Sequence, residues 1–434
     1  MLCGKRREIV LVVLIISLFS LLALGVPIFI ALNGSSFLSL IIATSIPPVA
    51  FVQRMFGGLD KFGLMAIPFF IFAANIMNSG GMAKRILNLA NKLVGGFRAG
   101  MALTTIVSCM FFGAMSGSAP ATVVAIGSII FPALIKANYG ESFSVGLVTS
   151  SSSVALLIPP SVTMIVYGAA TGVSVGALFM AGIGAGVIYG VFFMLYSILF
   201  TRKTEVIVQK KSTLKQIFFS TKDAFWALGV PVIIIGGIYG GIFTPTEAAA
   251  VSAAYAIIVS MFIYKELDFK KLYECGVESA ATTAMVMIMI AGASALSWVL
   301  TIGGIPQYLD RAILGLSESR IIILIAMNII MLIAGMFVDG VAFILILAPI
   351  FLPIALKIGI DPIHLGIIMV ANGAVGMFTP PFGLNLFVAS GSTGLPFSRI
   401  VKGIWPFIAI SILSLIVITY VPEISMWLPN MLYK

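Results

Sequence analysis

Two stretches of this chain repeat one pattern of prolines inside otherwise apolar sequence. Pro132–Lys136 reads Pro-Ala-Leu-Ile-Lys and is followed by Pro159-Pro160, and Pro353–Lys357 reads Pro-Ile-Ala-Leu-Lys and is followed, at the same interval, by Pro380-Pro381. Proline removes a backbone donor and clashes with the preceding turn, so it interrupts a helix. Paired interruptions at corresponding positions of two halves of a chain are typical of the binding site of a membrane protein built from an internal repeat.

The apolar runs around these motifs are long enough to cross a bilayer. The 434 residues are 60% hydrophobic and 9% charged, whereas a soluble domain carries about 25% charged residues. Runs of about 20 apolar residues recur along the whole length, and they lack the period-two alternation of membrane β-strands. We therefore predict an all-α polytopic membrane protein that lies in a lipid bilayer.

The basic residues follow the membrane topology and do not indicate binding of nucleic acid. The chain has 25 Lys and Arg against 15 Asp and Glu, and the basic residues gather in short hydrophilic loops, as the positive-inside rule requires. The segments from Arg202 to Lys222 and from Lys265 to Lys271 are therefore predicted to be cytoplasmic. The chain has no Gly-x-x-x-x-Gly-Lys-Ser/Thr phosphate loop, so no nucleotide is expected.

Counting the crossings from these loops gives the two repeats opposite orientations. Segments 99–135 and 318–356 each become a re-entrant hairpin, one entering from the cytoplasm and the other from the outside, with tips at Ser116–Pro120 and at Asp339. The sequence thus predicts an inverted repeat with two re-entrant helical hairpins and two broken helices. The basic residues Lys5–Arg7 do not fit this count, so the orientation of the first helix is left open.

The breaks carry polar residues in surroundings that are otherwise apolar. Unwound carbonyls coordinate cations such as Na⁺, and the amino termini of half-helices attract anionic groups. Ser116 and Ser118 lie beside the first break, which indicates ion or substrate binding. Asp339 lies in a run without other charges, where an ionisable residue indicates function, although a carboxylate there also suits the N-cap of the next helix. Asn372 and Asn385 bracket the second broken helix and offer further polar ligands.

Other polar residues have more ordinary interpretations. The Ser150–Ser153 strip fits either binding or the close packing of helices by small residues. Thr244–Glu247 marks a helix start, with proline in the first turn and glutamate at the positive end of the helix dipole. His364 is the single histidine and cannot build a multi-histidine metal site. Lys84–Arg98 has the mixed basic and apolar pattern of an amphipathic interfacial helix.

Five sequence motifs together are similar to those of a known family of membrane proteins. The chain resembles the large membrane (M) subunit of tripartite ATP-independent periplasmic (TRAP) transporters over essentially its whole length. The motifs are Ile67–Ile71, Gly113–Thr122, Leu157–Ser161, Gly241–Ala250 and Phe378–Asn385. Each motif is weak alone, and the set is specific.

The resemblance implies a Na⁺-coupled secondary active importer in a bacterial inner membrane, working by an elevator mechanism and having no enzymatic activity. It implies two or more coupling Na⁺ ions, a small membrane (Q) subunit, and a periplasmic substrate-binding (P) protein that delivers the ligand. The substrate is then expected to be a small organic acid, a carboxylate such as sialic acid or a C4-dicarboxylate. Two alternatives stay open, namely a stand-alone ion-coupled anion transporter that needs no binding protein, and an ion channel.

The resemblance also assigns residues to ion and substrate sites. One Na⁺ site is expected at the backbone around the first break, near Ser116, Ser118, Ala155, Ile158 and Pro160. The repeat-related Na⁺ site is expected near Asp339, Gly340, Gly376, Thr379 and Pro381. The substrate carboxylate is expected between the hairpin tips, near Ser118, Thr163, Asp339 and Asn385. Ala155 departs from the glycine expected at its position, which leaves a carbonyl ligand in place but puts the local flexibility in doubt.

The same reasoning divides the chain into a scaffold and a transport domain that contains both repeats. The predicted divisions are 1–98 for the N-terminal scaffold helices and interfacial arm, 99–200 for transport-domain repeat 1 with hairpin 1 and a broken helix, 201–317 for further scaffold helices and connecting loops, 318–395 for transport-domain repeat 2 with hairpin 2 and a broken helix, and 396–434 for a C-terminal helix.

Overall fold

A computed structural model describes residues 4–305, 307–308, 315 and 319–432, and every regular element in these ranges is a helix. Eight of the helices within these described ranges are long and apolar enough to cross a membrane. The predicted class, an all-α polytopic membrane protein, is confirmed. Part of the connection that ends the predicted division 201–317 lies outside the described residues.

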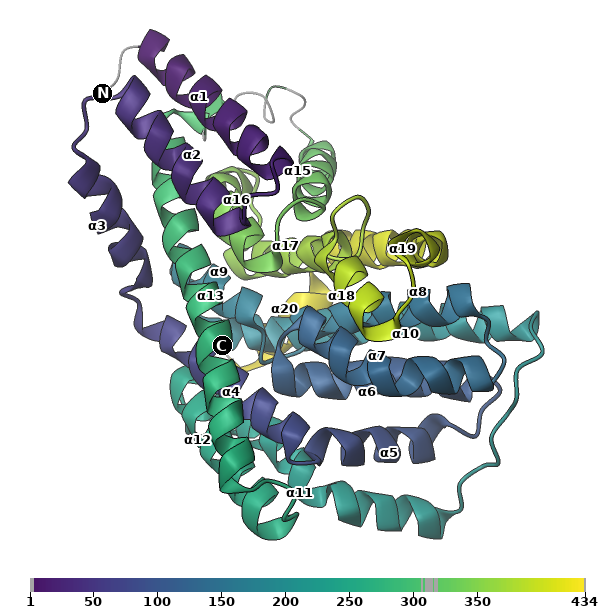
Figure 1. The fold of residues 1–434 in the computed structure, drawn as a ribbon. Helices are drawn as coiled ribbons and strands as arrows, with labels where there is room; N and C mark the ends of the chain where they lie inside the picture. Colours follow the sequence, from purple (N-terminus) through teal and green to yellow (C-terminus); the bar gives the residue numbers. More distant parts are fainter. Residues whose placement is uncertain (1–3, 306, 309–314, 316–318, 433–434) are drawn as a thin grey trace.

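One group of helices packs around the 34-residue helix α13 (Figure 1). α13 contacts α2, α3 and α4, while α4 packs on α12, α12 on α11, and α11 on α5. The helices of this first group are α1 (Gly4–Ala23), α2 (Ile28–Ala43), α3 (Pro48–Leu59), the 3₁₀ turn η1 (Phe62–Met65), α4 (Ala66–Ser79), α5 (Met82–Val94), α11 (Leu214–Tyr239), α12 (Pro245–Ile258) with the π turn η3 (Val259–Ile263), and α13 (Phe269–Ile302).

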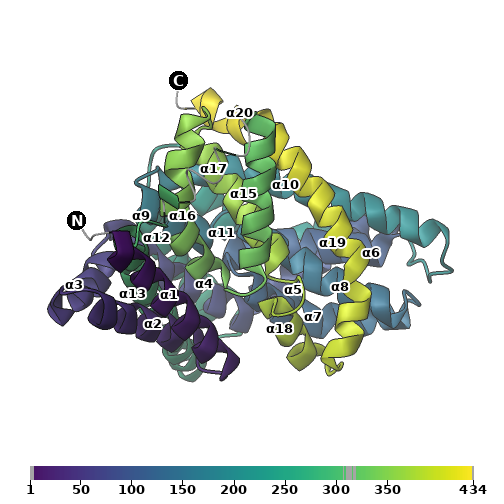
Figure 2. The same cartoon turned by 90° about the horizontal axis from the view of Figure 1, so that it is seen from above.

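The second group contains the two proline repeats and lies beside the first (Figure 2). Its first half comprises α6 (Gly100–Ser116), α7 (Ala119–Lys136), α8 (Glu141–Ser151), the 3₁₀ turn η2 (Ser152–Leu156), α9 (Val162–Thr171) and α10 (Val175–Arg202). Its second half comprises α15 (Arg320–Gly335), α16 (Gly340–Lys357), α17 (Pro362–Gly376), α18 (Leu384–Thr393), α19 (Phe397–Tyr420) and α20 (Glu423–Leu432).

The two halves of the second group pack on each other through equivalent helices. The second hairpin helix of each half packs on the segment that follows the break in the other half's broken helix. α7 thus packs on α18, and α16 packs on α9. The segments that precede the breaks are α8 and α17, and they pack on α19 and α10 respectively. This reciprocal packing is what two copies related by a two-fold axis produce. Entry of the hairpins from opposite faces of the membrane stays a prediction.

Buried polar side chains link the two halves at several points. The Tyr167 hydroxyl donates to the Pro362 carbonyl (2.7 Å), which joins α9 to α17. The Tyr189 hydroxyl contacts Ser153 (3.0 Å) and Ser411 (3.1 Å), which joins α10 to η2 and α19. Since a buried polar group without a partner is costly, these hydrogen bonds fix the register between the halves.

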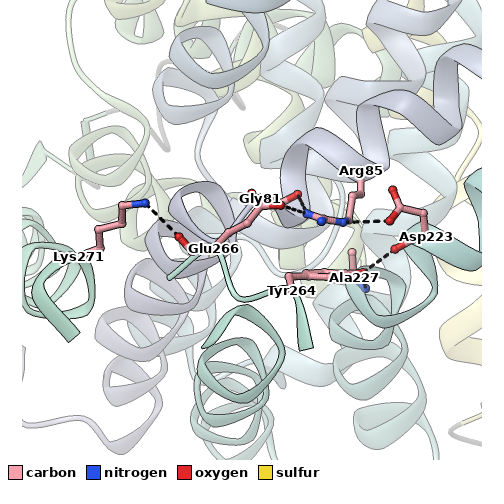
Figure 3. A network of polar contacts seen from close by, with 7 residues as sticks. All are labelled: Gly81, Arg85, Asp223, Ala227, Tyr264, Glu266 and Lys271. Atoms are coloured by element: carbon pink, nitrogen blue, oxygen red, sulfur yellow. Dashed lines mark hydrogen bonds and ion pairs between the residues drawn. The ribbon is translucent and has the colours of Figure 1, made fainter. Parts of the chain in front are cut away.

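The predicted amphipathic helix is present as α5, and its apolar side packs on α6 and α11. Arg85 on α5 forms an ion pair with Asp223 of α11 (3.2 Å) and with Glu266, which follows η3 (2.6 Å) (Figure 3). Its guanidinium also lies 3.8 Å from the ring centroid of Tyr264. Burial lowers the pKa of Arg85, but the Glu266 and Asp223 carboxylates outweigh this, so the pKa is raised. The network fixes α5 to the first helix group.

Two helix starts show how local sequence sets the boundaries. The helix start predicted at Thr244–Glu247 is confirmed as the start of α12. Thr244 and Glu247 form a capping box there, in which each side chain bonds the other's backbone amide. The predicted hydrophilic loop from Arg202 to Lys222 is wrong in its second half, because a capping box of Thr213 and Gln216 starts α11 at Leu214. The irregular segment is therefore shorter than the charge pattern indicates.

Candidate functional site

The first hairpin tip is a sharp break between α6 and α7. α6 ends at Ser116, Gly117 takes a left-handed conformation (φ +59°), and Ser118 is the N-cap of α7. A Cβ on Gly117 would lie 2.3 Å from the carbonyl oxygen of Pro160. Glycine is thus required here twice, for its backbone angle and for the close approach of the tip to the broken helix.

Several oxygen atoms gather at this tip. The Thr122 hydroxyl donates to the Ser118 carbonyl (2.8 Å), and the Ser116 and Thr122 hydroxyls lie 3.3 Å apart. The Ser116 hydroxyl also donates to the Ser118 carbonyl at 3.4 Å. With the Pro160 carbonyl beside Gly117, the donor set consists of hydroxyl and carbonyl oxygens, which are the ligands that hard cations prefer. These residues fit the Na⁺ site expected at the first break.

The alanine that replaces the expected glycine at position 155 is accommodated by a glycine opposite. A Cβ on Gly113 of α6 would lie 2.7 Å from the Ala155 Cα atom. α6 and η2 therefore approach at backbone distance even though residue 155 carries a methyl group. The absence of a side chain at Gly113 leaves room for this methyl group, so the break stays closely packed.

Asp339 occupies the corresponding place at the second hairpin tip. Its Oδ1 atom accepts hydrogen bonds from the amides of Val341 (2.9 Å) and Ala342 (3.3 Å), so it is the N-cap of α16. Its Oδ2 atom is buried and has no hydrogen-bond partner among the described residues. Both interpretations of Asp339 are thus compatible with the structure, since one oxygen caps the helix and the other is free to bind a ligand.

The second break brings two backbones together without intervening side chains. A Cβ on Gly376, at the end of α17, would lie 2.5 Å from the Gly335 carbonyl carbon at the end of α15. The Thr379 hydroxyl donates to the Val375 carbonyl (2.6 Å). The Asn385 amide donates to the Thr149 carbonyl (3.4 Å), and its Oδ1 is buried without a partner in the described part of the chain.

The hairpin tips and the broken helices meet at one cavity of about 430 Å³. Predicted site residues from both repeats lie on its wall, namely Ser116, Ser118, Thr163, Asp339 and Gly340. A Cβ on Gly340 would lie 2.9 Å from the Thr163 Cγ2 atom, so the two repeats are in contact at this point. The opposite wall is formed by α4 and α13.

Four helix amino termini converge on this central cavity. Its lining includes the first residues of α7 (Ala119), α9 (Val162), α16 (Gly340) and α18 (Leu384). Each helix start carries a partial positive charge of about half a unit from the aligned peptide dipoles. Among the described residues that line the cavity, none is basic. The helix ends and the Asp339 carboxylate therefore dominate the electrostatics of the cavity.

The other predicted residues lie on the breaks themselves. Those that do not line the cavity are Ala155, Ile158, Pro160, Gly376, Thr379, Pro381 and Asn385. The sequence analysis missed Thr122, whose hydroxyl completes the oxygen cluster, and Asn75 and Thr282, which belong to the cavity wall. A polar residue within the apolar run of α4 was the available signal for Asn75.

The residues with more ordinary interpretations lie elsewhere. The hydroxyls of Ser150 and Ser152 donate to carbonyls one turn back (2.7 Å each) and do not line the cavity, which favours a packing role. His364 is buried between the Ser425 hydroxyl (3.0 Å) and the Thr419 carbonyl (3.2 Å). It joins α17 to the C-terminal helices, and within the described residues no group of three or more His, Cys, Asp and Glu side chains could hold a metal ion.

An all-α polytopic chain in which interrupted helices from two repeats meet at one cavity has the architecture of a membrane transporter. The family comparison agrees with this class. Residues 15–424 match the model of the tripartite ATP-independent periplasmic transporter, DctM component. The chain belongs to this family, as the motifs in the sequence indicate.

Three relatives are similar over most of the chain. The C4-dicarboxylate TRAP transporter large permease protein DctM of Pseudomonas aeruginosa is 43% identical, covering 87% of this chain and 89% of that protein. The ectoine TRAP transporter large permease protein TeaC of Halomonas elongata is 37% identical, covering 97% and 99%. The isethionate TRAP transporter permease protein DctMQ of Oleidesulfovibrio alaskensis is 44% identical over 94% of this chain, which spans only 64% of that relative's length.

Two solved structures share the fold at low sequence identity. The YdaH transporter of Alcanivorax borkumensis has a TM-score of 0.60 and 13% identity, with 88% of each chain covered. MtrF of Neisseria gonorrhoeae has a TM-score of 0.59 and 14% identity, with 88% of this chain and 83% of MtrF covered. The predicted fold class is thus found in known membrane proteins.

Proposed function

We propose that this chain is the ion-coupled membrane component of a three-part importer for a small organic anion. In this proposal Na⁺ ions bind at the two breaks, and the substrate carboxylate binds between the hairpin tips in the central cavity. The protein then resides in a bacterial inner membrane.

The observation that carries the proposal is the convergence of four helix amino termini on the central cavity. Helix amino termini bind anions through free amides and through their dipoles. A cavity of about 430 Å³ is of the size that small-molecule sites have, roughly 300–1,000 Å³. The dipoles favour a carboxylate or a sulfonate, while the Asp339 Oδ2 atom and the carbonyls at the breaks favour cations. Binding of an anion and of cations by the same hairpins and broken helices allows one movement of these elements to carry both, which couples their transport.

An elevator movement is supported by the unequal division of polar groups around the cavity. The Asp339 carboxylate and the hydroxyls of Ser116 and Thr163 come from the hairpins and broken helices. The wall of α4 and α13 is mainly apolar, and its two polar side chains bond within the wall, since Asn75 donates to Ser279 (2.8 Å) and Thr282 donates to Glu278 (2.9 Å). Ligands held by one helix group can therefore move with it past a wall that makes few polar contacts.

The names of the relatives support the substrate class and the partners. They refer to C4-dicarboxylates, isethionate and ectoine, which all carry a carboxylate or a sulfonate. We propose a small carboxylate as the substrate, with C4-dicarboxylates as the first class to test and sialic acid as a further candidate. A small membrane subunit and a periplasmic binding protein are proposed as partners, because the family is tripartite.

Uptake of succinate into proteoliposomes tests the proposal. The chain is reconstituted with its small membrane subunit, the binding protein is added outside, and an inward Na⁺ gradient is compared with an equal K⁺ gradient. The proposal predicts uptake with Na⁺ only, and none when either partner is omitted. Uptake by the chain alone would instead support the stand-alone transporter, and single-channel currents would support the channel. If succinate is not transported, the same protocol is applied to other carboxylates and sulfonates, and failure of all of them contradicts the proposed substrate class.

A further inference from the structure

The seam between the two helix groups continues beyond the central cavity. On α13, Met285 and Met289 line the central cavity, while Ser294 and Ser297, on the following turns, line a second and smaller space. On α16, Val341 lines the central cavity, and later residues of the same helix line the smaller space. Figure 1 shows α13 running along the molecule beside α3 and α4. The spaces therefore lie in series along one seam.

The far end of this seam opens into a cavity of about 480 Å³ that is rich in polar and basic groups. We call it the outer cavity, and its lining residues are Gln53, Arg54, Gly57, Gly58, Lys61 and Ser294. Three of these residues also line the smaller space of about 120 Å³ next to it. No carboxylate is among the described lining residues of either space, so the local charge is positive.

The two cations of the outer cavity are held by neighbouring groups. The Arg54 guanidinium lies 5.4 Å from the ring centroid of Trp298 on α13. The Lys61 ammonium donates to the Ala169 carbonyl in the last turn of α9, where the helix dipole favours a positive charge. A Cβ on Gly58 would lie 2.4 Å from the Ser294 hydroxyl, so α3 packs directly on α13 below the cavity. Both cations remain exposed.

The position of the outer cavity along α13 places it on the face opposite the cytoplasmic loops. α13 begins at Phe269, within the basic segment Lys265–Lys271 that is predicted to be cytoplasmic. At about 1.5 Å per residue, Ser294 lies roughly 37 Å further along the helix, which exceeds the ~30 Å of a bilayer's hydrocarbon core. A separate cavity between α4 and the start of α13 is lined by Ser79, Lys271, Glu274, Cys275 and Glu278. The outer end of the seam is thus lined by two cations and no described carboxylate, whereas the cavity near the start of α13 has mixed charge.

We propose that Arg54, Lys61 and Ser294 form a separate anion site at the outer end of the seam, which receives the carboxylate of a small organic acid before it reaches the hairpin tips. Arg54 presents the planar fork that matches a carboxylate, and Lys61 adds a second charge with two donors beyond the one used at Ala169. A positively charged mouth also raises the local concentration of an anion. The direction of passage rests on the proposed function, whereas binding at this site does not.

The native Trp298 provides a direct test of binding. Trp226, Trp405 and Trp427 are replaced by phenylalanine, the protein is placed in lipid nanodiscs without partners or a Na⁺ gradient, and succinate is titrated at constant ionic strength. A saturable change in Trp298 fluorescence is expected, because an anion at Arg54 alters the contact between the guanidinium and the ring. Lys61→Gln is expected to raise the apparent Kd about tenfold or more, as loss of one charged hydrogen bond does. Arg54→Gln removes the guanidinium whose contact with Trp298 gives the signal, and is expected to abolish the response.

Three further variants make the outcome specific. Lys61→Arg keeps the charge and is expected to bind succinate more tightly than Lys61→Gln, which also shows that the fold accepts a change at this position. Arg320→Gln removes an exposed cation at the start of α15, on the same predicted face but away from the seam, and is expected to change nothing. Asp339→Asn alters the central cavity while keeping the cap of α16, and is expected to leave the response of Trp298 at the outer cavity unchanged. The inference is overturned if Trp298 gives no saturable response, or if the response survives in the Arg54→Gln, Lys61→Gln double variant. Either result leaves Na⁺-driven uptake, and hence the proposed function, to be judged separately.

Discussion

Replacing Asp339 separates its capping role from a role in ligand binding. Asp339→Asn keeps an oxygen that can accept from the amides of Val341 and Ala342, because Asn and Asp cap helices about equally well. It removes the negative charge from the side that carries the buried Oδ2 atom, which has no protein partner in the described structure. Asp339→Ala removes the cap and the charge together.

The two variants differ in their expected stability. Loss of an N-cap costs about 0.5–2 kcal/mol, so Asp339→Ala is expected to unfold at a lower temperature. Asp339→Asn is expected to unfold close to the unaltered chain, because the bonds to the two amides at 2.9 and 3.3 Å remain. Thermal unfolding in detergent, followed by tryptophan fluorescence, measures this difference.

Both variants are expected to lose Na⁺ affinity. A bond to a charged group contributes about 1.5–3 kcal/mol, which corresponds to roughly 10- to 150-fold in an affinity. The Na⁺ concentration that gives half-maximal uptake in proteoliposomes should rise by this factor for Asp339→Asn, although its stability is unchanged. Uptake by Asp339→Asn with the Na⁺ dependence of the unaltered chain would refute the reasoning and leave Asp339 as a helix cap only.

Three other predictions concern close packing and the arm helix. Gly117→Ala should abolish uptake, because its Cβ would lie 2.3 Å from the Pro160 carbonyl oxygen. Gly172 has a similar positive φ, but a Cβ there would meet no atom within 4 Å. Gly172→Ala should therefore lower only the stability, by about 1 kcal/mol. Gly376→Ala should likewise abolish uptake, because its Cβ would lie 2.5 Å from facing backbone, while Gly373→Ala on the same helix meets only a ring at 3.4 Å and should retain uptake. Arg85→Ala should destabilise the protein by about 1 kcal/mol, because it removes two partly exposed ion pairs and a ring contact. Lys84→Ala, at the exposed position before it, should not change the stability. Initial uptake rates and melting temperatures check these outcomes, and equal behaviour within any pair would contradict the corresponding argument.

The breaks could be located from the sequence because the residues that cause them are distinctive. The Pro159-Pro160 pair and its repeat interrupt helices whatever surrounds them, and Asp339 is conspicuous in an apolar run. Thr122 could not be singled out, since a threonine in a membrane helix normally bonds its own backbone. Met285 belongs to the cavity wall, yet an apolar residue that faces lipid has the same appearance in the sequence. Only the packing of α13 on the hairpins distinguishes the two.

Contacts between distant segments account for the rest of what the sequence did not reveal. The closeness of Gly117 to Pro160 depends on how two broken segments fold onto each other. The close contact between Gly113 and Ala155 likewise depends on how two segments that are distant in the chain pack together. Lys61 shows no motif at all, and its place beside the last turn of α9 follows only from the packing of the two helix groups.

The extent of substrate accumulation against its gradient tests coupled transport most directly. Proteoliposomes with all three components are given a tenfold inward Na⁺ gradient with no membrane potential, and internal and external succinate are measured at steady state. A tenfold gradient supplies about 1.4 kcal/mol per ion, so two coupled Na⁺ ions should sustain about a hundredfold accumulation. Equal succinate concentrations on the two sides, reached at the same rate with or without the Na⁺ gradient, would contradict the account.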